Sequence, residues 1–193
     1  MAINQITVLP IVTGALTSNG IVGVSMPQLA LALTNGLVQY VLTGITITSQ
    51  DVGTVGSGVG TGFGISLEVP ILFQNFQTTF TAAGINGTHS RLIINAISTA
   101  YSSVFRIANM VTTNVGVAVG TGVVSVIPNT IISIPTYIGN FTASLLLGIS
   151  APALATAIAK GLDQSLPTAK GTVIIAGPPS STSSTGNGLG KIL

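Results

Sequence analysis

The chain has 193 residues, of which only 4 % are charged, and its formal net charge at pH 7 is +2. Ordinary soluble domains contain about 25 % charged residues, so the charge deficit is the main anomaly of this sequence. A few scattered lysines form no phosphate-neutralising patch, which argues against a nucleic-acid partner. The lack of cysteine excludes disulfides, thiolate zinc sites and thiol nucleophiles.

The low charge raises the question of a membrane. The longest uncharged apolar stretch, 142–159, is interrupted by Gly148, Pro152 and several Ser and Thr residues, whereas a spanning helix needs about 20 predominantly apolar residues. No basic segment precedes an apolar run at the N-terminus, so neither a signal peptide nor an anchor is indicated. We therefore attribute the uncharged surface to burial against other protein chains, because interface cores are depleted in charge.

The chain repeats one pattern three times without gaps. Each copy begins with a short apolar stripe, as in Leu9, Val12 and Leu16, which indicates a short helix, with a strand as the alternative. Pro10 and Pro135 stand at equivalent places, and since proline suits only a first helical turn, this helix should begin close to them. An Asn-Gly turn follows in the first copy.

A longer amphipathic helix comes after the turn. Its apolar positions recur every fourth residue: Leu29, Leu33, Leu37 and Val41, then Ile93, Ile97, Tyr101 and Phe105, then Leu154, Ile158, Leu162 and Leu166. Pro27 and Pro152 should lie in its first turn. Beside the stripe are the small residues Gly36, Ala100 and Gly161, where we expect a neighbouring helix to approach closely.

Strands are expected after each long helix. The β-branched runs at 45–48, 111–113 and 172–175 fit a pleated surface. Glycine-spaced segments follow, and in the first two copies the chain then returns through a short apolar run. Whether these strands pair within the chain or between chains is left open.

The sequence therefore predicts an α+β fold in a single domain, 1–193. It consists of three tandem helix-turn-helix-plus-strand-pair repeats, 5–69, 70–127 and 128–193, packed into one body. A pseudo-threefold arrangement would suit three such units, and a linear row is the alternative. The Ser/Thr/Gly-rich tail, 177–193, cannot bury enough apolar area to order itself. We expect it to lie across a neighbouring subunit, anchored by Leu189, Ile192 and Leu193.

No catalytic constellation is apparent. His89 is the only histidine and has no counterpart in the other repeats. Asp51, Glu68 and Asp163 occupy unrelated places in the unit, and the glycine runs do not match a phosphate-binding loop. We expect no enzyme activity, no cofactor, no metal and no small-molecule substrate.

In its cysteine-free, Gly/Thr/Ala/Val-rich composition, low charge, tandem units and Ser/Thr/Gly tail, the chain resembles the minor virion structural proteins of tailed bacteriophages. The resemblance implies a structural component of the head, neck, tail or baseplate of a virion, whose partners are copies of itself and other structural subunits. A membrane-interacting or pore-forming protein is the alternative function, and an enzyme of unknown class is the third.

Overall fold

The computed structural model describes residues 3–44, 46–54, 57–65, 69–105, 109–115, 119–127, 130–168, 170–176 and 184–192, and describes side chains within 3–42, 69–104 and 131–168. The helices are α1 (Gln5–Ser18), α2 (Met26–Gly44), α3 (Val69–Ala82), α4 (Thr88–Phe105), α5 (Thr130–Ala143) and α6 (Ala151–Ser165), followed by the short 3-10 helix η1 (Leu166–Thr168). The strands are β1 (Thr46–Thr54), β2 (Ser57–Ile65), β3 (Asn109–Val115), β4 (Val119–Ile127), β5 (Lys170–Ala176) and β6 (Ser184–Ile192).

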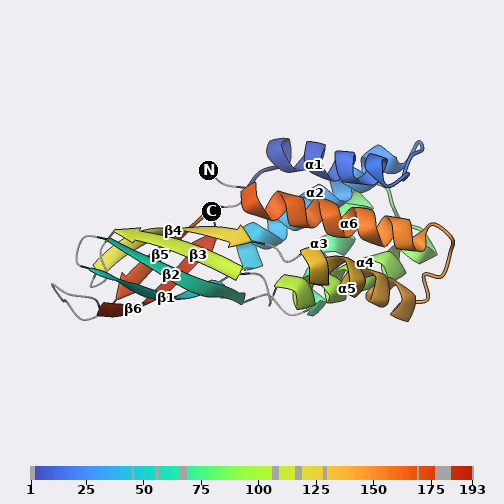
Figure 1. Cartoon of the computed structure of the whole chain (residues 1–193). Helices are drawn as coiled ribbons and strands as arrows, with labels where there is room; N and C mark the ends of the chain where they lie inside the picture. The colour runs from blue at the N-terminus through green and yellow to red at the C-terminus, as the bar shows by residue number, and fades with distance from the viewer. Residues whose placement is uncertain are drawn as a thin grey trace.

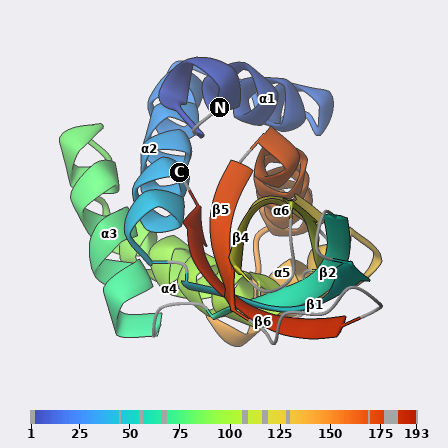
Figure 2. The same ribbon diagram turned by 90° about the vertical axis from the view of Figure 1, so that its left-hand side faces the viewer.

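The helices form a closed ring around a common apolar core. Each helix packs on the next one along the chain, and α6 also packs on α1. The predicted stripes face inward, where Leu16, Leu33, Phe76, Phe80 and Tyr101 are buried. Figure 2, seen from the barrel side, shows the helices arranged around a common centre.

The strands close into an antiparallel barrel in which each pairs with the next and β6 pairs with β1. Within the first pair, Thr46 lies opposite Ile65 and Asp51 opposite Gly60. On its other side, Thr46 lies opposite Lys191 of β6. Figure 1 shows the barrel beyond one end of the helices, so that helices and strands occupy separate halves of the molecule.

The predicted fold class, an α+β fold of three helix-turn-helix-plus-strand-pair repeats packed into one body, is wrong. The part of the chain whose side chains the structure describes is an all-helical body of six helices and the turns between them. The strand pairs leave this body and pair with strands of the other repeats. The reason lies in the strand edges: an isolated pair leaves two edges unpaired, whereas the closed barrel leaves none.

Of the two predictions about proline positions, one is wrong and one is confirmed. Pro10 and Pro135 lie inside α1 and α5, which begin several residues earlier, at Gln5 and Thr130. In α1 the Asn4 side chain caps the helix by accepting a hydrogen bond from the Thr7 amide (3.0 Å). Pro10 removes one backbone amide donor near this exposed end of the helix. Water can donate to the carbonyl that is left without a partner. Pro27 and Pro152 are the second residues of α2 and α6, as predicted.

Candidate interaction surface at the tip of the helices

The turns that join α1 to α2, α3 to α4 and α5 to α6 gather at the end of the bundle opposite the barrel. In each turn an amide donates to the carbonyl five residues earlier: Ile21 to Leu16 (3.0 Å), Ile85 to Phe80 (2.9 Å) and Leu146 to Phe141 (3.0 Å). The residue before each donor has positive φ: Gly20 (77°), Gly84 (77°) and Leu145 (60°). This is the Schellman termination of a helix, repeated three times.

Two of the three turns expose large aliphatic side chains. The exposed fractions are 72 % for Val22, 93 % for Val24, 75 % for Leu145, 70 % for Leu147 and 103 % for Ile149. We call these five residues the apolar tip. Single exposed aliphatic residues are ordinary, but a cluster of them marks an interaction site.

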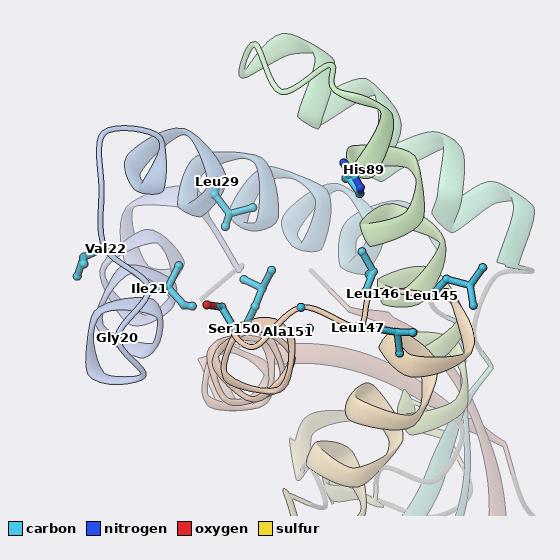
Figure 3. A pocket seen from close by; sticks show the side chains of 12 residues that line it. Gly20, Ile21, Val22, Leu29, His89, Leu145, Leu146, Leu147, Ser150 and Ala151 are labelled. Atoms are coloured by element: carbon cyan, nitrogen blue, oxygen red, sulfur yellow. The ribbon is translucent and has the colours of Figure 1, made fainter.

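Hollows separate the turns. One of about 710 Å³ lies between the first and third turns, and Figure 3 shows Ile21 and Leu29 on one side of it and Leu146 and Leu147 on the other. His89, at the start of α4, lies at its edge. A second hollow of about 540 Å³ lies between the first and second turns. Both are mainly aliphatic and open outward, so they belong to the surface of the tip.

A second group of exposed aliphatic residues lies at the other end of the bundle, in the first turns of α1, α3 and α5. The exposed fractions are 86 % for Ile6, 41 % for Ile71, 84 % for Ile131 and 43 % for Ile132. We call these four residues the waist, because the first turns of α1, α3 and α5 are at the end of the bundle that faces the barrel. Helices α1, α3 and α5 contain no charged residue.

The barrel-side half of the core holds a buried polar cluster. Asp163 of α6 is only 2 % exposed, and burial raises the pKa of its carboxyl to about 6, while the Ser133 hydroxyl of α5 lowers it to a smaller extent. Burial also raises the pKa of Tyr101 and Tyr137, and the neighbouring Tyr40 and Asp163 add to this effect. The Tyr101 ring meets Tyr40 edge-on, with centroids 5.1 Å apart.

This cluster contains a carboxyl that takes up a proton readily. The Oδ2 atom of Asp163 and the hydroxyl of Tyr137 have no hydrogen-bond partner in the described structure. A buried carboxylate without a cation is costly, so the carboxyl takes a proton more readily than in water. Among the described residues, no three His, Cys, Asp or Glu side chains gather as a metal site would require.

The helix-packing residues of the sequence prediction lie in the core. A Cβ added to Gly36 would lie 2.5 Å from Cε1 of Phe76 in α3. A Cβ on Gly161 would lie 3.3 Å from Cα of Val12 in α1. Ala100 is fully buried.

Two of the predicted tail anchors lie in a strand of the chain's own barrel. Leu189 and Ile192 belong to β6, whose backbone pairs with β1 and β5 of the same chain, while Leu193 lies outside the described residues. Strand β6 is held in place because β1 and β5 offer it two strand edges. Truncation after residue 177 would therefore remove a strand of the chain's own barrel.

The remaining candidate residues stay apart. Asp51 is in β1 and Asp163 in α6, and His89 is exposed at the start of α4. Glu68 lies outside the described residues.

The sequence reasoning overlooked both the apolar tip and the burial of Asp163. The signal for the tip was the run Leu145, Leu146 and Leu147 where the first copy has Gly20, Ile21 and Val22. The signal for Asp163 was its place directly after Leu162 of the apolar stripe.

None of the helices in the described ranges has the length and apolar character of a membrane-crossing segment. Comparison of the chain with protein-family models, with curated proteins and with solved structures finds no match.

Proposed function

We propose that this protein is a non-enzymatic structural subunit that assembles with copies of itself and with other structural subunits of a large particle, such as a virion. The observation that carries the proposal is the waist on the charge-free helices α1, α3 and α5. Burying one exposed Ile side chain contributes about 1.5–3 kcal/mol. Several such residues around one circumference give a neighbouring subunit a favourable contact.

The absence of charge makes this surface suitable for burial in a lateral contact. Charged side chains at an interface core have to be desolvated and paired, and Ile6 and Ile131 impose no such cost. The virion as location rests on the compositional resemblance. The membrane-interacting alternative is favoured by a different feature, the apolar tip.

The native mass in lipid-free buffer tests the proposal. We expect the full chain to form large oligomers by light scattering, and the double variant Ile6→Ser/Ile131→Ser to shift towards the monomer mass. The matched control is Gln74→Ser/Gln77→Ser on the exposed side of α3, which should assemble normally. A full chain that is monomeric at micromolar concentration, or a waist variant that assembles like the wild type, contradicts the proposal.

A further inference from the structure

We propose that the apolar tip is a lipid-contact surface that inserts shallowly into a bilayer, with the helices standing on the membrane and the barrel pointing away from it. This goes beyond the proposed assembly function, since it uses the opposite end of the bundle and a different kind of partner.

The first support is that the turns that carry the apolar tip also contain no charged residue. No Asp, Glu, Lys or Arg occurs in 19–25, 83–88 or 144–150. Each residue of the apolar tip is at least 70 % exposed, so its hydrocarbon is available without any rearrangement of the core. A turn with these properties gains free energy on entering the acyl region and desolvates no charge.

The second support is the state of the backbone. Polar backbone groups that enter hydrocarbon need internal partners, which usually keeps irregular turns out of it. Here the first three amides after each of α1, α3 and α5 donate to carbonyls of the preceding helix, as Asn19, Gly20 and Ile21 do at 3.0 to 3.2 Å. The hydrogen bonding of the turns therefore reduces the main cost of shallow insertion.

The third support is the shape of the surface, which favours lipid over a protein partner. The exposed side chains project from separate turns, and open hollows of about 710 and 540 Å³ lie between them. A protein would need a relief that matches both the projections and the hollows. Acyl chains are fluid and fill such a surface without a matching shape.

The second turn gives the insertion a polar edge. It carries Asn86 and Thr88 where the other turns carry aliphatic residues, and His89 where they carry serine. Arg91 lies exposed in the first turn of α4. Polar and cationic groups at this level suit the headgroup region, and Arg91 can pair with a lipid phosphate. Binding should therefore strengthen when anionic lipid is present.

A single reporter tests the inference, because the chain has no tryptophan of its own. The variant Ile149→Trp places an indole in the apolar tip, and Ile6→Trp places one at the waist. With vesicles of phosphatidylcholine and phosphatidylglycerol, we expect the emission of Ile149→Trp to shift to the blue and to be quenched by brominated acyl chains. The emission of Ile6→Trp should remain unchanged.

Vesicle flotation of non-fluorescent variants provides a second measurement. We expect Val24→Ser/Ile149→Ser to lower the vesicle partition coefficient by about a hundredfold, since each aliphatic side chain contributes about tenfold. The waist variant Ile6→Ser/Ile131→Ser should float as the wild type does, while circular dichroism confirms that both variants are folded.

Several results overturn the inference: a full chain that does not bind vesicles, equal binding by wild type and tip variant, or a blue shift of Ile149→Trp in lipid-free buffer that is lost on dilution. The last result would mean that a second copy covers the tip. Since the assembly proposal is tested at the waist and without lipid, either proposal can fail alone.

Discussion

Leu145 adopts the left-handed backbone conformation that Gly20 adopts at the equivalent position of the first turn, with φ of 60° against 77°. Glycine takes this conformation without strain, whereas a leucine there costs about 1 kcal/mol or more. The third turn thus keeps an exposed, strained leucine where the first two turns have glycine. Strain of this kind persists where the side chain has a task, which fits its place in the apolar tip.

The variant Leu145→Gly should therefore be more stable than the wild type but bind vesicles more weakly. We expect the free energy of unfolding to rise by about 1 kcal/mol, because relief of strain exceeds the entropy gained by the unfolded chain. Thermal unfolding and vesicle flotation measure the two effects. Leu147→Gly, at a position without positive φ, is the control and should weaken binding with no gain in stability. A lower unfolding midpoint for Leu145→Gly would contradict the inference that the backbone of Leu145 is strained.

Stability should depend on pH through Asp163. Its pKa is about 6 in the folded chain against 3.8 for the ordinary group, so the folded state binds the proton more tightly. The contribution to stability is therefore fully present below pH 3.8 and is lost as the pH rises to about 6, by about 3 kcal/mol in all. Denaturant unfolding across this range measures it.

Asp163→Asn should remove this loss and be more stable than the wild type at pH 7. Ser133→Ala gives the matched test, because the Ser133 hydroxyl lowers the pKa of the carboxyl. Without that hydroxyl the fall in stability should extend to higher pH. An identical pH profile for the wild type and Asp163→Asn would show that the carboxyl is not the group responsible.

The contact between Gly36 and Phe76 predicts that even one methyl group is too large at this position. Gly36→Ala places a Cβ 2.5 Å from Cε1 of the Phe76 ring, which has to move. We expect a loss of about 1–3 kcal/mol in the free energy of unfolding, and partial recovery in the double variant Gly36→Ala/Phe76→Leu. Gly14→Ala is the control: nothing lies within 4 Å of the new methyl group, so stability should rise by about 0.5–1 kcal/mol. If both alanine variants change the free energy of unfolding alike, α2 and α3 are not in close contact at Gly36.

Ala100, at the matching place in the second repeat, allows a similar test. The residue is fully buried, so Ala100→Leu should overpack the core and lower the free energy of unfolding by about 1–3 kcal/mol. Ala100→Gly serves as a comparison, since it removes volume instead of adding it. An unchanged unfolding midpoint for Ala100→Leu would mean that the core has room for the larger side chain.

The local helical pattern could be read from the sequence, whereas the partners of the strands could not. Leu33, Ile97 and Ile158 recur at helical spacing because one face of each long helix is buried, and such a face leaves a periodic signal. The strands instead are mostly rich in Gly, Thr and Val, and such residues carry little information about which strand pairs with which. Only the backbone pairing of β6 with β1 shows that they close within one chain.

The candidate site was missed because its residues depart from the repeat that guided the sequence reasoning. Leu147 stands where Val22 and Asn86 stand in the other copies, and Asp163 stands where Val38 and Ser102 stand. Comparison of the copies emphasises what they share. The exposed aliphatic turn and the buried acid are features of particular copies, and their surroundings become visible only when the turns and helices are brought together in space.

Because the ring of helices and the barrel are both closed, the chain could start at a different repeat. The helical ring closes where α6 meets α1 and the barrel closes where β6 meets β1, and the two termini lie near each other between the halves. The present ends are therefore only one of several places at which the chain can be opened. A circular permutant that joins the old termini by a short flexible linker and starts at Val69 retains every helix and strand. It should fold to the same helix content and unfold cooperatively, so the ring can be entered at any repeat.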